Sequence, residues 1–187
     1  MIGNVKVIMI LAMTEDGIIG DDQGNLPWSN CSEDMKFFKD TTINHKHIIM
    51  GRKTLDSIGR LLPERSTYIL SKSHDIKPNV FLGTNTSHGI FSSMTSLKEY
   101  IDCLTGDRTI QSVVIAGGKQ IYEQFLEYAD EVYISNIPKQ YYRLVPGNPI
   151  DIKDLLTRIQ NDPQLTSRGT MHIGLSLNID TYAFSRK

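Results

Sequence analysis

The sequence lacks a charge excess and has little cysteine, and both absences exclude classes of protein. Its 20 basic and 21 acidic residues give a formal net charge of −1, so nothing in its overall charge favours nucleic acid or an anionic membrane as a partner. Only Cys31 and Cys103 occur in 187 residues. Without CxxC spacing they indicate reduced thiols in a cytoplasmic protein rather than a disulfide framework. Any anion site must be local.

Leader-peptide and metal-site signals are also weak. The apolar stretch 5–13 is short, has no small-residue cleavage pattern and runs into a polar loop, so it indicates a buried first strand rather than a signal peptide. His45 and His47 form the only close histidine pair, with both expected on one face of a strand. No cysteine or acidic cluster joins them, and a metal site is not expected.

What the sequence does contain is an alternation of short apolar and amphipathic stretches, which favours an α/β layer architecture. We expect strands at 5–13, 47–50, 67–71, 80–82, 112–116 and 131–137. Helices are expected at 33–42 (capped by Ser32), from Gly51 onward, at 96–104 with a stop at Gly106, and at 118–128. Residues 14–28 form a long loop in this scheme, residues 146–149 a turn, 152–159 a short helix, and 171–185 antiparallel strands.

This order predicts one domain over residues 1–187. Its twisted, mostly parallel central sheet has an antiparallel C-terminal edge and helices on both faces.

Two strand-to-helix junctions have the composition of phosphate sites. Gly117-Gly118 follows the strand 112–116 and opens a helix, while Gly51-Arg52-Lys53-Thr54 adds two cations and a hydroxyl at a similar junction. Glycines admit close ligand approach, and helix N-termini favour phosphate. Together they suit a dinucleotide pyrophosphate, and Arg52, Lys53 and Lys72 suit a further 2′-phosphate, hence NADP. For each stretch alone, a tight turn or a solvated helix start is at least an equal interpretation.

Asp34 is a candidate for binding a charged substrate or managing a proton. A helix from Ser32 places it in the first turn, beside Met35 and Phe38 on the core face. Desolvation there would raise its pKa, whereas the helix dipole favours the anion. From spacing alone, a carboxylate that merely complements the dipole is the commoner interpretation. Arg65, after a Pro63-Glu64 turn, can clamp a carboxylate or lie at the surface, and Tyr122 can face the core or a cofactor.

Taken in order, these stretches resemble one family, dihydrofolate reductase. The similarity covers about residues 5–137 and is carried by Ile18-Ile19-Gly20, Leu26-Pro27-Trp28, Asp34-Met35-Lys36-Phe37-Phe38-Lys39, Ile49-Met50-Gly51-Arg52-Lys53-Thr54, Ser57-Ile58-Gly59-Arg60, Leu62-Pro63-Glu64-Arg65, Ile115-Ala116-Gly117-Gly118 and Ile121-Tyr122. The resemblance implies an NADPH-dependent reduction of dihydrofolate to tetrahydrofolate for one-carbon metabolism and thymidylate synthesis. It also implies inhibition by antifolates and a monomer.

The resemblance assigns the substrate site. Asp34 would bridge a ring nitrogen and the amino group of the pterin, with Ser135, where the family usually has threonine, orienting it. Arg65 would hold the glutamate carboxylate, and Trp28 and Tyr122 would complete the catalytic set. An apolar slot would be formed by Met35, Phe38, Ile58 and Leu62, and backbone carbonyls near the pterin and nicotinamide amides would come from Ile10, Ala12 and Ala116.

The cofactor site is assigned in the same way. Gly117-Gly118 resembles a family pair joined by a cis peptide bond. The loop residues Ile19, Gly20 and Leu26 would close over the nicotinamide, together with Ala12 and Ala116. The phosphates and adenosine would be held by Gly51, Arg52, Lys53, Thr54, Leu70, Ser71, Lys72, Gly117, Gly118, Lys119, Gln120, Ile121 and Tyr122.

Besides Ser135, the sequence departs from the family at three further places. One extra residue separates Trp28 from the acid, so counting from Pro27 nominates Glu33, whereas the helical face and the Asp-Met-Lys-Phe-Phe-Lys pattern favour Asp34. Glu64 replaces a common glycine and would slightly weaken carboxylate binding. Residues 138–151 match no family loop. There are three rivals. One is a reductase of ribosylamino-pyrimidines, which would lack the Trp28, Asp34 and Arg65 set, and another is a non-catalytic structural relative. The third, an unrelated nucleotide-binding module, would require all the ordered motifs to be coincidence.

Overall fold

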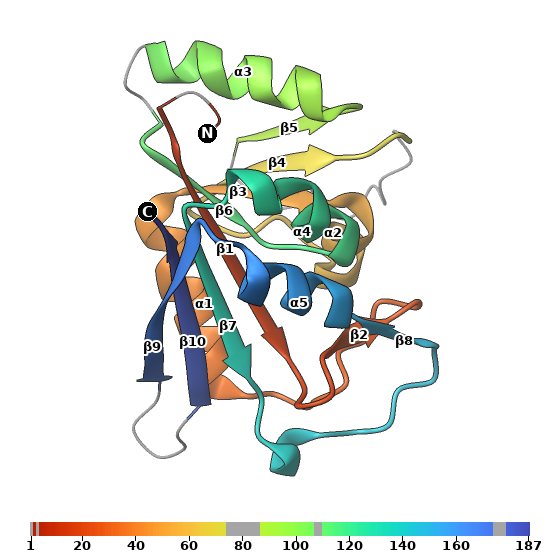
Figure 1. Ribbon diagram of the computed structural model, residues 1–187. Coiled ribbons are helices and arrows are strands. Elements are labelled where there is room, and N and C mark those ends of the chain that lie inside the picture. Colours follow the sequence, from red (N-terminus) through yellow and green to blue (C-terminus); the bar gives the residue numbers. More distant parts are fainter. Residues whose placement is uncertain (1, 3, 74–86, 107–109, 174–178) are drawn as a thin grey trace.

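An eight-stranded twisted sheet organises the chain (Figure 1). The computed structural model describes residues 2, 4–73, 87–106, 110–173 and 179–187. In spatial order the strands are β5 (His88–Phe91), β4 (Ser66–Leu70), β3 (His47–Gly51), β6 (Ser112–Ile115), β1 (Lys6–Met13), β7 (Glu131–Asn136), β10 (Ile179–Arg186) and β9 (Leu165–Ile173).

Strand direction follows the prediction. All pairings from β5 across to β7 are parallel, whereas β10 is antiparallel to both β7 and β9. The mostly parallel sheet with an antiparallel C-terminal edge is therefore confirmed. The carboxyl ends of β1, β3, β4 and β6 meet at one edge, where ligands of such folds bind.

Helices cover both faces of the sheet, also as predicted. They are α1 (Ser32–His45), α2 (Arg52–Ile58), α3 (Met94–Gly106), α4 (Lys119–Phe125) and α5 (Lys153–Asn161), with 3-10 turns η2 (Leu126–Tyr128) and η3 (Lys139–Tyr141). One core joins Met9 and Leu11 of β1 to α3, α4 and α5. Ile8 and Ile10 point to the other face, toward Phe37 and Phe38 of α1. Burial on both faces explains why β1 is continuously apolar from Val7 to Met13, after the exposed Lys6.

The start of α1 differs from the prediction. Ser32 is the first helical residue and not the cap, because Cys31 occupies the capping position and the Ser32 hydroxyl donates to Glu33 instead. Met35 does not face the core, since it is 59% exposed. Phe38 does pack against the core beneath α2. Helical periodicity therefore predicted the buried position of Phe38 correctly but wrongly included Met35 in the buried face.

The predicted loop 14–28 contains a strand. Residues Ile18–Asp21 form β2, which pairs antiparallel with β8 (Pro149–Asp151). Residue 149, expected in a turn, is thus the first of a strand. Neither strand exceeds four residues, so neither carries a readable period; each exists because the other lies beside it. The strand β5 was not predicted for the same reason, since it is short and contains Gly89.

Several boundaries also shift. The helix predicted at 118–128 ends at Phe125 and continues as the 3-10 turn η2, and β9 begins at Leu165, six residues before the predicted 171. His45 ends α1 and His47 begins β3, with Lys46 left-handed between them. The two histidines therefore do not share a strand face, and they bond Ser112 and Tyr68 respectively. The strand predicted at 80–82 lies outside the described residues.

Candidate active site

Asp34 lies in the first turn of α1 and is partly buried. Its carboxyl group accepts a hydrogen bond from Ser135 of β7. Burial raises the pKa of Asp34 from 3.8 to about 6, and the Ser135 hydroxyl bond limits the rise. Desolvation therefore outweighs the helix dipole here. The result is a carboxyl group that can change charge near neutral pH.

Tyr122 belongs both to the core and to the site. Its side chain is 6% exposed, and its hydroxyl donates to the Ile10 carbonyl of β1 at 3.0 Å. Burial raises the pKa of Tyr122, and the nearby Asp34 carboxylate adds to the rise, so the phenol stays protonated. Its contact brings α4 against the predicted pterin wall of β1. Ala12 of β1 and Ser135 of β7 are register partners on that wall.

Arg65 is a buried arginine whose guanidinium group is held by two hydrogen bonds. It is 6% exposed, its Nε donates to the Pro63 carbonyl at 2.8 Å, and its Nη1 donates to Thr42 Oγ1 at 2.8 Å. Thr42 Oγ1 in turn donates to the Phe38 carbonyl of α1 at 2.7 Å. Two bonds hold the guanidinium plane while other N–H groups stay available. An arginine fixed this way is suited to bidentate carboxylate binding.

Glu64, which precedes this arginine, has a left-handed backbone with φ of 64°. That conformation costs about 1–2 kcal/mol for a residue other than glycine. We expect Glu64→Gly to raise the free energy of unfolding by about 1 kcal/mol, raising Tm by roughly 2–4 °C. By removing an acid beside Arg65 it should also slightly lower the KM for a substrate whose carboxylate Arg65 binds. Thermal unfolding and steady-state kinetics would measure both effects.

Glu64→Gln is the matched control, since it removes the charge and keeps the strained backbone. We expect it to lower KM without raising Tm. An equal gain in Tm for the two variants would show that charge, and not the backbone, limits stability at this position.

The two glycine junctions predicted from sequence lie side by side. The Gly51 N–H at the end of β3 donates to the Gly117 carbonyl at 2.8 Å, and the Ala116 N–H donates to the Ile49 carbonyl at 2.9 Å. The Gly117-Gly118 peptide bond is cis, as expected. A Cβ at Gly117, where φ is 104°, would lie 2.8 Å from the Tyr122 hydroxyl. The start of α2 and the start of α4 therefore face the same edge of the sheet.

The basic residues predicted to bind phosphate differ in their environments. Arg52 Nη1 is paired with Asp56 Oδ2 at 2.8 Å within α2, whereas Lys53 and Lys72 are exposed. Asp56 Oδ1 is buried without a hydrogen-bond partner among the described residues. Ser71 is 8% exposed and its hydroxyl bonds the Ser73 backbone, so it is less free than predicted for a phosphate contact. Thr54, Leu70 and Lys119 are partly buried, Ile121 is buried and Gln120 is exposed.

The apolar residues assigned to the substrate slot, to the loop over the nicotinamide and to the catalytic set differ in exposure. Trp28 is 5% exposed and packs with Cys31, Ile137 and Ile179. Phe38 and Leu62 pack against the core beneath α2, and Ile19 packs against the core beneath α4. Leu26, Met35 and Ile58 are 47%, 59% and 36% exposed. Exposed apolar side chains at these three positions fit the walls of an open binding slot.

Residues 138–151, whose role the sequence did not reveal, hold the loop between β1 and α1. Tyr142 accepts from the Glu15 N–H through its hydroxyl at 2.6 Å, and Arg143 Nε donates to the Leu26 carbonyl at 3.0 Å. The Gly147 N–H donates to Asp21 Oδ2 at 3.0 Å. These bonds, with the β2–β8 pairing, hold the loop at its start (Glu15), at β2 and near its end (Leu26). Only the acids Asp21 and Asp22 in the loop hinted at such acceptor sites.

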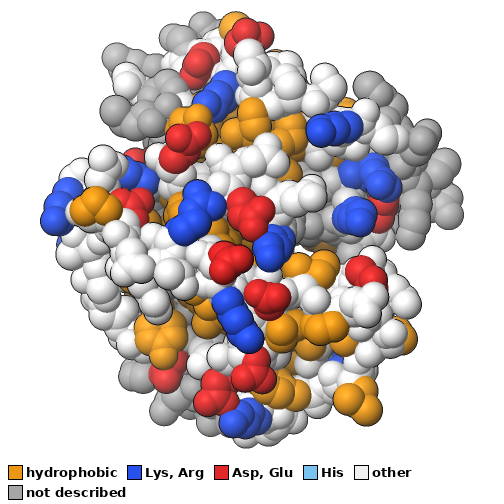
Figure 2. All heavy atoms as spheres, turned by 45° about the vertical axis from the view of Figure 1, so that its right-hand side comes forward, with side chains coloured by type: hydrophobic (Ala, Val, Ile, Leu, Met, Phe, Trp, Pro, Cys, Tyr) orange, Lys and Arg blue, Asp and Glu red, His pale blue; other side chains and the backbone are white. Residues whose placement is uncertain are grey.

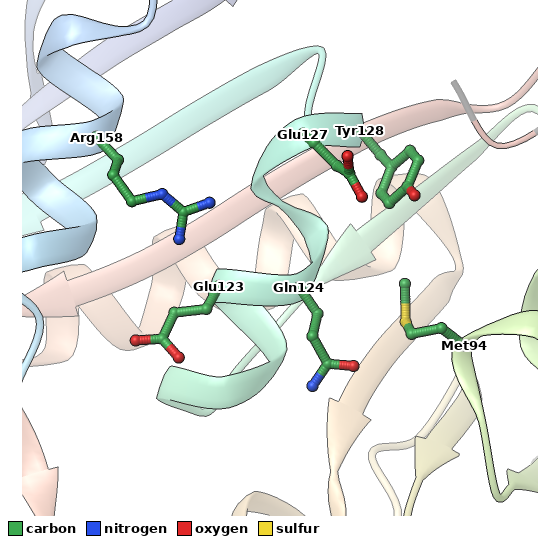
Figure 3. Close-up of a pocket in the computed structure, with 6 residues that line it drawn as sticks. All are labelled: Met94, Glu123, Gln124, Glu127, Tyr128 and Arg158. Carbon is green, nitrogen blue, oxygen red and sulfur yellow. The ribbon is translucent and has the colours of Figure 1, made fainter.

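A shallow pocket elsewhere does not coincide with the predicted site. It lies against α4 and η2, with Met94 of α3 and Arg158 of α5 on opposite sides (Figure 3). Its lining residues are Met94, Glu123, Gln124, Glu127, Tyr128 and Arg158, none of which carries a predicted role. Within the described part of the chain, no three His, Cys, Asp or Glu residues cluster to hold a metal ion.

Surface charge agrees with the near-neutral composition. On the face shown in Figure 2, basic side chains gather at the upper right and charges of both signs alternate over the rest. No described helix has the length and apolarity needed to cross a membrane. Cys31 is buried and Cys103 exposed, and neither forms a disulfide, as predicted.

These features define a class of protein. A carboxyl group bonded to Ser135 lies in the first turn of α1, a buried arginine is held by Thr42 of the same helix, and two glycine-marked helix starts lie side by side at the carboxyl ends of β3 and β6. This combination is typical of reductases that hold a ring substrate beside a dinucleotide.

Comparison with known proteins names the family. The model of the family "Dihydrofolate reductase" matches residues 6–147. Over 136 residues the chain is 35% identical to a dihydrofolate reductase of Buchnera aphidicola subsp. Baizongia pistaciae, covering 72% of this chain and 73% of the relative. It is 33% identical to that of Bacillus subtilis over 135 residues, covering 72% and 71%. The chain belongs to the dihydrofolate reductase family, the NADPH-dependent oxidoreductases that reduce dihydrofolate to tetrahydrofolate.

A solved structure shows the same fold over the whole length. The dihydrofolate reductase from Enterococcus faecalis, complexed with NADP(H) and RAB-propyl, superposes with a TM-score of 0.71 at 23% identity. The match covers 99% of this chain and 98% of that one. The C-terminal strands β9 and β10, which lie beyond the residues 6–147 that the family model matches, therefore also belong to the same fold.

Proposed function

We propose that this chain reduces dihydrofolate with Asp34 as the acid that binds the pterin and Arg65 as the clamp for the glutamate tail. One observation carries the proposal: the partly buried Asp34, hydrogen-bonded to Ser135, has its pKa raised to about 6. A carboxyl group in this state can accept two donors from a pterin edge and favour protonation of the ring.

The residues around Asp34 have distinct tasks in this proposal. Ser135 orients the carboxylate, and Tyr122 fixes the Ile10 carbonyl against α4. Met35, Phe38, Ile58 and Leu62 form the apolar walls that exclude water, with Trp28 behind the loop. A carboxylate on the far edge of the ring does not reach N5 directly, so the proton for N5 comes through water. Arg65 binds the glutamate carboxylate through N–H groups that Pro63 and Thr42 leave available.

The residues present also fit a dinucleotide phosphate. The Gly51 N–H donates to the Gly117 carbonyl at 2.8 Å, so the junctions before α2 and α4 lie side by side, and Arg52, Lys53 and Lys72 would supply positive charge. Bound NADPH supplies the hydride. Gly51, Thr54, Gly117, Gly118, Lys119, Gln120 and Ile121 would hold its phosphates, and Ile19, Gly20 and Leu26 would cover its nicotinamide.

The reaction is tested by the near-ultraviolet absorbance of NADPH in the presence of purified protein and dihydrofolate, repeated with methotrexate. We expect a substrate-dependent loss of NADPH that the antifolate blocks. NADPH binding without turnover would point to the ribosylamino-pyrimidine reductase instead. A folded protein that binds neither ligand would point to a structural relative.

Arg52 should select the phosphorylated cofactor. We expect Arg52→Ala to weaken NADPH binding by roughly 10–100-fold, because one charge-assisted phosphate contact is lost, and to leave NADH binding almost unchanged. Isothermal titration with both cofactors would measure this. Arg158→Ala, an exposed arginine in α5, is the control and should change neither affinity. An equal loss of affinity for NADPH and NADH would show that Arg52 does not recognise the 2′-phosphate.

The remaining proposals concern the state of the protein. We infer a single-domain, cytoplasmic monomer that binds small molecules and no nucleic acid. The support is a net charge of −1 and one sheet that draws strands from residue 6 to residue 186. Light scattering during gel filtration would test the monomer, for which we expect the mass of one 21.1 kDa chain.

A further inference from the structure

Two buried hydroxyl groups, one contacting the other, extend from Asp34 into the core. Ser135 of β7 bonds the Asp34 carboxyl group, and Ser135 Oγ lies 3.3 Å from Thr181 Oγ1 of β10. Both residues are 0% exposed and stand opposite each other in the β7–β10 register. Thr181 lies outside residues 6–147, which the family model matches. The strand β10 thus adds a polar group to the site that sequence similarity did not reveal.

The direction of each hydrogen bond follows from Asp34. An ionised carboxylate only accepts, so the single proton of the Ser135 hydroxyl is donated to Asp34. In its second contact Ser135 can therefore only accept, and Thr181 must be the donor. A donor to the Ser135 oxygen polarises its O–H group and strengthens the bond to the carboxylate.

We propose that Thr181 is a positioning residue of this enzyme, whose hydroxyl directs the Ser135 proton toward Asp34 and thereby favours the ionised carboxylate. The proposal rests on the function of Asp34 proposed above. Thr181 itself contacts neither the substrate nor the cofactor in this account and acts only through Ser135.

Other groups around Asp34 do not supply the same effect. Tyr122 of α4 and Cys31 before α1 interact electrostatically with Asp34, and burial raises the pKa of both, so both are neutral near pH 7. Glu33 adjoins Asp34 in α1, and its charge would oppose ionisation. Asp180 precedes Thr181 in β10 and points to the opposite sheet face.

The expected effect is modest. The 3.3 Å separation is longer than the usual 2.7–2.8 Å of an O–H···O bond. We expect loss of the Thr181 hydroxyl to raise the Asp34 titration midpoint by about 0.3–1 pH unit. A shift of this size is measurable, and its sign is fixed by the direction of the bonds.

The test is Thr181→Val in the full chain, which replaces the hydroxyl by a methyl group of similar size. The Asp34 carboxyl carbon would be titrated by NMR in the unliganded protein, and the pH dependence of hydride transfer would be recorded in parallel. We expect both midpoints to rise, and Thr181→Ser to restore both. If Thr181→Val does not fold, Thr181→Cys, a weak donor, should shift the midpoints in the same direction.

Two controls separate this role from a general effect on the core. Thr67 of β4 is also 0% exposed, and its Oγ1 has no partner among the described residues, so Thr67→Val makes the same chemical change away from Asp34 and should shift nothing. In a Ser135→Ala background, Thr181→Val should cause no further shift.

The outcomes are distinguishable. An unchanged NMR midpoint in Thr181→Val, an equal shift in Thr67→Val, or a full shift without Ser135 would each overturn the role of Thr181. A raised NMR midpoint with an unchanged rate profile would show that Asp34 ionisation does not control the reaction. That result would overturn the claim that Thr181 serves catalysis and count against the proposed function of Asp34.

Discussion

Asp34→Asn should slow hydride transfer at neutral pH by about 10²–10⁴-fold, the range typical of a lost acid–base group. Asparagine keeps the size of the side chain, but it cannot carry the charge that pairs with a protonated pterin. Single-turnover loss of NADPH absorbance would measure the chemical step directly. Near-normal turnover at pH 7 would contradict the role given to Asp34.

Glu33→Gln is the matched control, because Glu33 is the neighbouring acid that counting from Pro27 would have selected. The Glu33 carboxylate accepts a hydrogen bond from the Ser32 hydroxyl at the protein surface. We expect the rate of this variant to stay within a small factor of the wild-type rate. A large loss of rate in Glu33→Gln together with a small loss in Asp34→Asn would show that Glu33, and not Asp34, is the active-site acid.

The same Asp34→Asn variant should be more stable than the wild type at neutral pH. Because the folded pKa of Asp34 is raised from 3.8 to about 6, ionisation of Asp34 opposes folding. The stability linked to its neutral form is complete below about pH 4 and is lost as the pH rises through about 6. We therefore expect equal stabilities of the two proteins near pH 4 and a gain of up to about 3 kcal/mol for Asn at pH 7. Urea unfolding across this pH range would measure the difference.

Arg65→Leu should raise the KM for dihydrofolate by roughly 10²–10³-fold while NADPH affinity stays nearly constant, because two charge-assisted bonds to one carboxylate would be lost. Arg65 is 6% exposed and pre-oriented by Thr42 and Pro63, so little side-chain entropy offsets those bonds. Steady-state kinetics with dihydrofolate and direct titration with NADPH would separate the two ligands.

Arg65→Lys tests geometry apart from charge. Lysine keeps the charge but has no planar fork, so we expect it to recover only part of the affinity. Equal weakening of folate and NADPH by Arg65→Leu would mean that the arginine maintains the fold of the site and does not clamp the substrate tail.

The strands and helices with strong local signals could be predicted from the sequence. Residues 7–13 are apolar because β1 is buried on both faces, and Gly117-Gly118 marks a junction where a Cβ would meet Tyr122. The order of these segments also identified the family, whose model matches residues 6–147. The roles assigned to Asp34, Arg65 and Arg52 remain predictions; Arg52 follows the carboxyl end of β3, whereas Arg65 precedes the amino end of β4.

Short or mutually dependent elements could not be predicted. The strands β2 and β8 lie more than a hundred residues apart and are too short to show a period. The predicted core position of Met35 was wrong because helical spacing defines a face but not how far its neighbours cover it. The prediction that Ser32 caps α1 was wrong, because the position of the cap depends on how the preceding chain packs.

By itself, then, the sequence determined the class of fold, the family and the residues that could carry the chemistry, because these depend on local periodicity and on motifs read in order. Tertiary structure alone decided the environment of those residues: the burial that raises the pKa of Asp34, the Thr42 bond that fixes Arg65, the segment 138–151 that holds the loop, and the pairing of Ser135 with Thr181. Each of these joins groups far apart in the chain. Their energies depend on distance and exclusion of water, which exist only once the sheet has brought the segments together.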